Sequence, residues 1–584
     1  MEKIIKFIIM LILLAFIWDT QILFSQNKND FVKGRKYLQE PLKPKTYRPP
    51  IDSLVALNLQ RWKGYKLGLL ITWGVYTQWG IIDSWTLCSY DAGWNHRTGP
   101  YADDYDTYKK QYEKIQTYFN PVNFNPEPWV TAFKNAGVKY ILVMTKHLDG
   151  FCMYDTKTTD YSITNDKCPF HTNPRANIAN EIANAARNQG LKVGAYFSKA
   201  DWNNNYFWWR YFGVTWLDVN YNTSVYQEQW NAFKLFTYIQ LDEITRNLGK
   251  LDILYLDGSW VKPGSNMDID MPSIAANVRI NQPGMLIVDR ASGQYEDYLT
   301  PEYDIPPEPL GVPWELVSPM SPWWGHVPGI WYYPSDSIVH TLVEVVAKGG
   351  NLLLGLGPDK NGVLEPKCYE RLQDIGNWMS INSSAIYETV YNIPFKSENI
   401  YFTTKKDTAF AIYMAYNNQQ TMPPYISWDG LKPKTGTEVF LLGYNLPLSW
   451  TTNSTGITTV TIPVEIQNNP PCLYAWTIKF IRSDIIHIGN EIPKTFFLSQ
   501  NFPNPFNPLS KINFNLPRGS RAGRITTLKV YDILGKEITT LVNEQLQAGS
   551  YEVTFDGSKL PSGVYFYKLS SANYTETKKM ILIK

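Results

Sequence analysis

Residues 251–260, LDILYLDGSW, constrain the fold of this 584-residue chain more than any other stretch. A short apolar run between Gly249 and Gly258 is typical of a strand that is buried on both faces, as in a parallel sheet. Asp257 then stands at the carboxyl end of that strand. In (β/α)8 barrels the carboxyl ends of the strands carry the catalytic groups. Because Asp-Gly is also an ordinary turn signal, Asp257 alone slightly favours a simple turn over a catalytic role.

A second stretch has the same form and favours a catalytic role of Asp257 over a simple turn. Residues 286–290, LIVDR, are a buried strand that ends in charge, and TPEY at 300–303 follows on the loop. Two carboxyl groups facing each other across a barrel mouth are what glycoside cleavage requires, one as nucleophile and one as proton donor. We expect Asp257 to be the nucleophile and Glu302 the acid/base. Glu315 is a rival for the second role, because it lies on the next strand and could also reach the rim.

Buried strands alternate with helical segments over residues 59–390. This alternation predicts an α/β fold, a (β/α)8-type (TIM-like) catalytic barrel. From residue 391 to 482 the pattern changes to short alternating strands, which predict a small antiparallel β-sandwich. The expected helices of the barrel are 128–137, 176–189, 224–248, 274–282, 335–348 and 367–381.

With these motifs the chain resembles glycoside hydrolase family 29, the α-L-fucosidases, from about residue 61 to residue 480. KHLDGF at 146–151 is similar to the family's KHHDGF, and GGNLLLGLGP at 349–358 to its GGNLLLNVGP. Arg290 and Glu302 are also twelve positions apart, as in the family. The resemblance implies an exo-acting, retaining hydrolase that releases terminal α-linked L-fucose, or a related or modified sugar, from glycans or polysaccharides. It implies no cofactor.

Two positions depart from the family pattern. Thr72 stands where the family has a sugar-contacting His, and Leu148 replaces the second His of KHHDGF. A hydroxyl cannot reproduce the reach or charge of an imidazole, so we expect one side of the sugar pocket to be widened. On the strand at 191–201, Tyr196 and Phe197 point to opposite faces, and the sequence leaves open which one faces the barrel interior. The residues that we expect to bind sugar are His147, Arg290, Thr72, Trp73, Tyr196 and Trp314.

Composition narrows the classes of partner. A formal net charge of +2 gives no indication of a nucleic-acid partner or an anionic membrane surface. Aromatic residues make up 15% of the chain, which suits stacking on sugar faces, although packing accounts for most of them. Residues 203–211 are dense in Trp, Tyr and Asn and form either a sugar-facing loop or a packed lid. The five cysteines show no zinc-site spacing, so no metal is indicated, and a Cys152–Cys168 disulfide is possible.

The two ends of the chain indicate export. Residues 1–26 have early lysines, a short apolar run and a small residue near the end, which predicts a secretory signal peptide. Residues 27–58 are polar and rich in proline, and we expect an extended lead-in. After a linker at 483–495, residues 496–584 contain QNFPNPFNP and end in KKMILIK. These phrases resemble the C-terminal sorting domains of the type IX secretion system in Bacteroidetes and related bacteria.

The resemblance at the C-terminus implies a small β-sandwich, the type IX secretion machinery as a partner, and a secreted or cell-surface protein delivered through the periplasm. A carbohydrate-binding module is the alternative for this segment. For the whole chain two other classes stay open. One is a catalytically silent sugar-binding protein, because two imidazoles are replaced. The other is a structural surface adhesin, in which Asp257 and Glu302 would be incidental charges.

Overall fold

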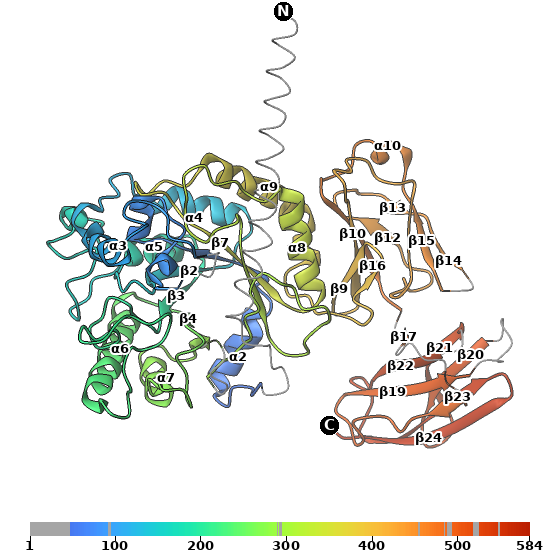
Figure 1. The fold of residues 1–584 in the computed structure, drawn as a ribbon. Helices are drawn as coiled ribbons and strands as arrows, with labels where there is room; N and C mark the ends of the chain where they lie inside the picture. Colours follow the sequence, from blue (N-terminus) through green and yellow to red (C-terminus); the bar gives the residue numbers. More distant parts are fainter. Residues whose placement is uncertain are drawn as a thin grey trace, which may run out of the picture. The chain divides into compact units, whose positions relative to one another are not determined.

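The structure is a computed structural model that describes residues 47–90, 95–288, 290, 295–453, 456–483, 485–487, 493, 495–517, 525–546 and 549–584. The expected signal peptide and the lead-in up to residue 46 lie outside these residues. The chain divides into two compact units, Met1–Ser383 and Ser384–Lys584, which are described separately (Figure 1).

Seven parallel strands form a curled sheet in the first unit, in the order β5-β4-β3-β2-β1-β7-β6. Nearly all their residues are buried, since helices cover the outer face and side chains fill the interior. The apolar runs of the sequence therefore correspond to these strands. Their bounds are β1 Leu67–Ile71, β2 Tyr140–Lys146, β3 Lys192–Ser198, β4 Ile253–Asp257, β5 Leu286–Val288, β6 Glu315–Pro319 and β7 Asn351–Leu356.

The segment that follows β5 bonds to both edges of this sheet. The N–H of Asp297 donates to the carbonyl of Ile287 in β5 over 2.9 Å, and the N–H of Tyr303 donates to the carbonyl of Val317 in β6 over 3.0 Å. A parallel bridge pairs Glu302 with Val317. The segment thus takes the place of an eighth strand, and the predicted TIM-like barrel is confirmed. Glu302 is held on this bridging segment, whereas the sequence suggested a loop.

Helices surround the barrel and one lies beside its amino-terminal end. In α2 the buried side chains Val55, Leu59 and Trp62 join the core inside the sheet. Its first turn is capped by Asp52, whose carboxylate accepts from two backbone N–H groups. The extended lead-in expected up to residue 58 is therefore wrong from residue 53 onward. The α-helices are α2 Ser53–Trp62, α3 Tyr105–Tyr112, α4 Pro126–Asn135, α5 Ile178–Asn188, α6 Gln227–Asn247, α7 Met271–Asn281, α8 Ser335–Ala347 and α9 Pro366–Asn382.

The second unit begins with two antiparallel sheets around one core, in the orders β13-β12-β16-β10-β9-β8 and β11-β15-β14. The all-β architecture expected after the barrel is confirmed. The bounds are β8 Lys396–Ser397, β9 Ile400–Lys405, β10 Thr408–Met414, β11 Tyr425–Trp428, β12 Val439–Leu441, β13 Pro447–Leu448, β14 Trp450–Thr452, β15 Thr458–Thr461, α10 Val464–Gln467 and β16 Ala475–Ile481.

Two four-stranded antiparallel sheets follow, in the orders β17-β22-β19-β18 and β21-β20-β23-β24. Alternate side chains of these strands form one apolar core. Part of the expected linker is a strand, because β17 pairs with β22. The bounds are β17 Ile485–His487, β18 Phe497–Leu498, β19 Leu509–Leu516, β20 Ile525–Tyr531, β21 Glu537–Gln545, β22 Gly549–Asp556, β23 Gly563–Ser571 and β24 Tyr574–Leu582.

Two further observations concern the described residues of both units. None of their helices combines the length and the apolar character that crossing a bilayer requires. All five cysteines carry free thiols, so Cys152 and Cys168 do not form the disulfide that the sequence allowed.

Candidate active site

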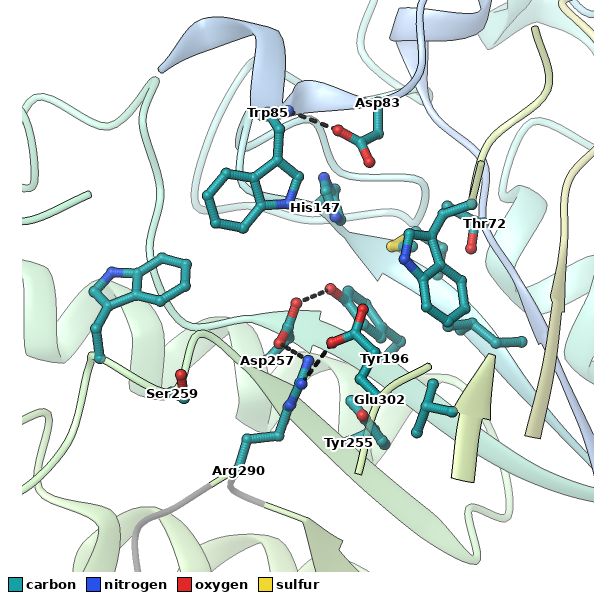
Figure 2. A pocket seen from close by; sticks show the side chains of 15 residues that line it. Thr72, Asp83, Trp85, His147, Tyr196, Tyr255, Asp257, Ser259, Arg290 and Glu302 are labelled. Carbon is teal, nitrogen blue, oxygen red and sulfur yellow. Dashed lines mark hydrogen bonds and ion pairs between the residues drawn. The ribbon is translucent and has the colours of Figure 1, made fainter. Parts of the chain in front are cut away.

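A pocket opens at the carboxyl ends of the barrel strands (Figure 2). Several strands contribute side chains to this pocket, because parallel strands bring their carboxyl ends to one rim. Asp257 ends β4, Tyr196 lies in β3, and Glu302 comes from the segment paired with β6. The lining side chains are Leu70, Thr72, Asp83, Trp85, Met144, His147, Tyr196, Tyr255, Asp257, Ser259, Trp260, Arg290, Glu302, Val317 and Trp324.

Arg290 joins the two carboxylates that the sequence singled out. Its Nη1 donates to Oδ1 of Asp257 over 2.8 Å, and its Nη2 donates to Oε2 of Glu302 over 2.7 Å. Arg290 has a φ of +41°, a left-handed conformation that costs a non-glycine residue energy. The carboxyl groups therefore occupy neighbouring positions on one guanidinium, as Figure 2 shows.

Asp257 is held in its ionised form. Burial acts to raise the pKa of this carboxyl, but the positive charge of Arg290 and the hydroxyl of Tyr196 outweigh it, so the net pKa shift is downward. The Tyr196 hydroxyl donates to the second carboxylate oxygen, Oδ2. Asp257 thus combines a low pKa with a position in a pocket, which are the properties of a carboxylate nucleophile.

The strand β3 settles the choice between Tyr196 and Phe197. Tyr196 faces the barrel interior and lines the pocket, and its ring stacks on Tyr255 of β4 at 5.6 Å. Phe197 faces the opposite side, where the ammonium group of Lys146 lies 4.2 Å from its ring centroid. The alternation along a strand accounts for both positions.

His147 lies in the pocket, as the sequence suggested. The Ser84 hydroxyl and His147 Nδ1 form a hydrogen bond, and the imidazole stacks against Tyr196 with 6.0 Å between ring centroids. The imidazole is therefore fixed on two sides. With Nδ1 engaged, Nε2 is the ring nitrogen left to contact a bound molecule.

The two departures from the family motifs are placed differently. Thr72 lines the pocket and is buried, and its hydroxyl finds no hydrogen-bond partner among the residues that the structure describes. Leu148 is fully buried and does not line the pocket. Only the change at Thr72 therefore alters the pocket wall directly, and the expectation that Leu148 widens the wall is wrong.

Trp73 and Trp314 are the two expected sugar-binding residues that the structure does not bring to the pocket. Trp73 packs among the rings of Phe119, Phe124 and Trp129 outside the sheet. Trp314 precedes β6, and its indole N–H donates to the carbonyl of Lys348 over 3.3 Å. Both indoles fill space between the sheet and its surrounding segments.

Glu315 cannot act at the rim. It is the first residue of β6 and pairs with Asn351, the first residue of β7, so it lies at the amino-terminal end of the barrel. It is fully buried and accepts a hydrogen bond from Tyr140. Burial raises the pKa of Glu315 to about 8, although the hydrogen bond from Tyr140 acts to lower it. The rival for the acid/base role is thereby excluded by strand direction.

Sequence reasoning missed several lining residues. Asp83 is one of them: its Oδ1 accepts from the N–H of Trp85 over 2.8 Å. Asp followed by Ser is an ordinary capping pair, so no local signal marked it. Tyr255 could have been found, because it shares a strand face with Asp257 two positions on. Within the described part of the chain, no group of three or more His, Cys, Asp or Glu side chains is arranged to hold a metal ion.

Comparison with known proteins agrees with this geometry. Tissue alpha-L-fucosidase of Bos taurus is 25% identical over 471 residues, which are 75% of this chain and 91% of the bovine protein. Alpha-L-fucosidase of Branchiostoma floridae is 26% identical over 470 residues, 74% of this chain and 95% of that protein.

Solved structures show the same fold. Thermotoga maritima alpha-fucosidase in complex with fucose matches with a TM-score of 0.59 at 26% identity, over 74% of this chain and 100% of that one. Alpha-L-fucosidase isoenzyme 1 from Paenibacillus thiaminolyticus matches with a TM-score of 0.60 at 24% identity, over 74% and 100% of the two chains.

Three family descriptions match consecutive parts of the chain. Residues 394–481 match the alpha-L-fucosidase C-terminal domain, and residues 500–584 match the secretion system C-terminal sorting domain. Residues 37–384 match alpha-L-fucosidase. Since that last match spans more than half of the chain, the protein belongs to the α-L-fucosidase family, glycoside hydrolase family 29.

Proposed function

We propose that this protein is an exo-acting, retaining α-L-fucosidase that releases terminal α-linked L-fucose, or a related sugar, from glycans or polysaccharides. The observation that carries the proposal is the pairing of one guanidinium, that of Arg290, with two carboxylates, Asp257 and Glu302, in the barrel mouth of a family member. Two carboxyl groups on either side of one glycosidic bond can attack and protonate it.

In the first step, Asp257 attacks the anomeric carbon and forms a covalent glycosyl-enzyme, while Glu302 protonates the leaving oxygen. In the second step, Glu302 takes a proton from water, which attacks the same carbon and frees Asp257. The lowered pKa of Asp257 supports its role as nucleophile. Retention requires a separation of about 5–5.5 Å between the carboxyl groups once sugar is bound.

The sugar would lie against the polar side chains opposite the carboxylates. His147 would use Nε2, since Ser84 engages Nδ1. Thr72 offers a buried hydroxyl that no described residue satisfies, so a sugar hydroxyl there would complete its hydrogen bonding. Arg290 and Tyr196 would remain near the reacting carbon through their bonds to Asp257. The mechanism needs no cofactor.

The test is hydrolysis of an aryl α-L-fucoside, with the product followed by proton NMR. The expected result is release of fucose whose first-formed anomer is α, because double displacement retains configuration. A first-formed β anomer would contradict the nucleophile role of Asp257. Binding of fucose without turnover would favour the silent sugar-binding alternative, and neither binding nor turnover would favour the adhesin.

We also propose that the protein is exported by the type IX secretion machinery, with an amino-terminal signal peptide for passage to the periplasm. The match of residues 500–584 to a secretion sorting domain supports this. Removal of residues 490–584 is expected to leave hydrolysis of small substrates nearly unchanged and to stop export. Delivery of the truncated protein across the outer membrane would overturn the proposal.

A further inference from the structure

The segment between β3 and α6 carries two sets of aromatic side chains. Trp202, Phe207 and Trp208 are buried and pack inside the protein. Tyr211, with 69% of its surface exposed, and Phe212, with 39%, lie on the outside. The segment is therefore neither only a packed lid nor only a sugar-facing loop, because its inner rings pack and its outer rings meet solvent.

Three exposed rings surround the half-buried Trp209. The centroids of Tyr211, Phe212 and Tyr226 lie 5.6, 5.7 and 5.2 Å from that of Trp209. We call Trp209, Tyr211, Phe212 and Tyr226 the aromatic platform. Exposed aromatic side chains that group in this way indicate a binding surface. Single exposed rings scattered over a protein are ordinary, whereas a contiguous exposed patch marks an interaction site.

The backbone of the platform is held in place by Asn220. Its Oδ1 accepts from the N–H of Trp209 over 2.8 Å. Its Nδ2 donates to the carbonyls of Trp209 at 3.0 Å and Phe212 at 3.2 Å. The backbone that carries the rings is thus held before any ligand arrives, which lowers the entropy cost of binding on them.

A series of ring contacts runs to the pocket from Trp208, the residue that precedes the platform in sequence. Trp208, next to Trp209 in sequence, stacks on Trp202 with centroids 5.4 Å apart. Trp202 packs edge-on against Trp85, again at 5.4 Å, and Trp85 contacts Trp260 at 5.6 Å. Trp85 and Trp260 line the pocket. The segment also follows β3, so it rises from the same rim as the two carboxylates.

We propose that the aromatic platform binds the sugar residues on the leaving-group side of the cleaved bond, by stacking their apolar C–H faces on Tyr211, Phe212 and Tyr226. The inference rests on the proposed fucosidase activity and adds a preference within it, for oligosaccharides or polysaccharides with a terminal fucose over small fucosides. Rings with polar edges suit carbohydrate, because they offer an apolar face beside a hydrogen-bonding group.

The test compares two substrates, an aryl α-L-fucoside and an oligosaccharide of at least three sugars with a terminal α-L-fucose. Tyr211→Ala is expected to lower kcat/KM on the oligosaccharide at least fivefold and to leave the aryl fucoside within twofold. Tyr211→Phe keeps the ring and is expected to retain wild-type values. Tyr425→Ala is the matched control, because Tyr425 is 61% exposed on β11 of the second unit.

Equal effects of Tyr211→Ala on both substrates, or no effect on either, would overturn the platform while leaving the fucosidase activity standing. If the wild-type protein hydrolyses neither substrate, the proposed activity fails. Calorimetric binding of the same oligosaccharide then tests whether the aromatic platform binds sugar. Weaker binding by Tyr211→Ala, with unchanged binding by Tyr425→Ala, would support it. Unchanged binding by both variants would refute it.

Discussion

Nη1 of Arg290 lies 2.8 Å from Oδ1 of Asp257, and this ion pair joins the end of β4 to a residue with a left-handed backbone conformation. The pairing explains why a carboxylate at this depth stays charged. The unfavourable φ therefore occurs at a residue whose guanidinium meets both carboxylates in the barrel mouth.

Asp257→Asn is expected to lower kcat on aryl α-L-fucosides at least ~10³-fold, because an amide is isosteric with the carboxylate but a poor nucleophile. Steady-state kinetics and a thermal melt measure activity and folding on the same preparation. Asp268→Asn is the matched control, since Asp268 is an exposed residue that does not line the pocket. Near-normal rates in Asp257→Asn would refute its role as nucleophile.

Glu302→Gln is expected to slow hydrolysis ~10²–10⁴-fold on substrates with poor leaving groups, because proton donation is lost. Activated aryl fucosides, whose leaving groups need little protonation, should lose less. The measurement is a series of aryl fucosides with leaving groups of different pKa. A uniform loss across the series would contradict the assignment of Glu302 as the acid.

Glu315→Gln replaces the buried carboxyl group at the amino-terminal end of the barrel. We expect this variant to keep wild-type activity and to change the pH dependence of stability. Because the folded-state pKa of about 8 lies above the ordinary value, the folded protein holds this proton more tightly than the unfolded chain does. The contribution of Glu315 to stability is therefore complete below its unfolded pKa and is lost as pH rises toward 8.

Calorimetry between pH 5 and pH 8.5 measures this dependence. The wild-type melting temperature of the barrel should fall by several degrees more than that of Glu315→Gln, since ~1 kcal/mol shifts Tm by about 2–4 °C in domains of 150–250 residues. Parallel curves for the two proteins would show that Glu315 does not titrate in this range. A strong loss of turnover in Glu315→Gln would instead reopen its candidacy as the acid.

The sequence predicted the barrel because its strands are short apolar runs with distinct ends, such as the one that finishes at Asp257. The bridging segment around Glu302 has no such run, so its strand-like pairing became apparent only in the structure. The direction of β6 could have excluded Glu315 as the acid/base from the sequence alone, because Glu315 precedes the apolar residues of β6 and so starts that strand.

Other features depend on contacts between distant segments. Nothing local distinguishes Trp73 and Trp314, which pack against the sheet, from Trp85, which lines the pocket. Likewise, the bond between Ser84 and His147 joins residues 63 positions apart. Patterns along the chain identify strands and their ends, whereas the side chains that complete a pocket are determined by how loops pack over it.

Thr72→Val is expected to raise KM for the preferred sugar, because it removes a pocket hydroxyl without changing the shape of the side chain. If a sugar hydroxyl pairs with Thr72, the loss should be the ~1–3 kcal/mol of a buried polar group left unpaired, or about 5–150-fold in kcat/KM. Thr237→Val is the matched control. The Thr237 hydroxyl is also buried without a partner among the described residues, but it lies in α6 and does not line the pocket.

The same position bears on which sugar is preferred. A threonine hydroxyl has a shorter reach than an imidazole and carries no charge, so its contact with a plain L-fucose is weaker, and kcat/KM on plain α-L-fucosides is expected to stay below about 10⁴ M⁻¹s⁻¹. Fucosides that carry an added substituent at the hydroxyl facing Thr72 should be better substrates. Efficient hydrolysis of plain fucosides, together with unchanged kinetics in Thr72→Val, would show that Thr72 does not determine specificity.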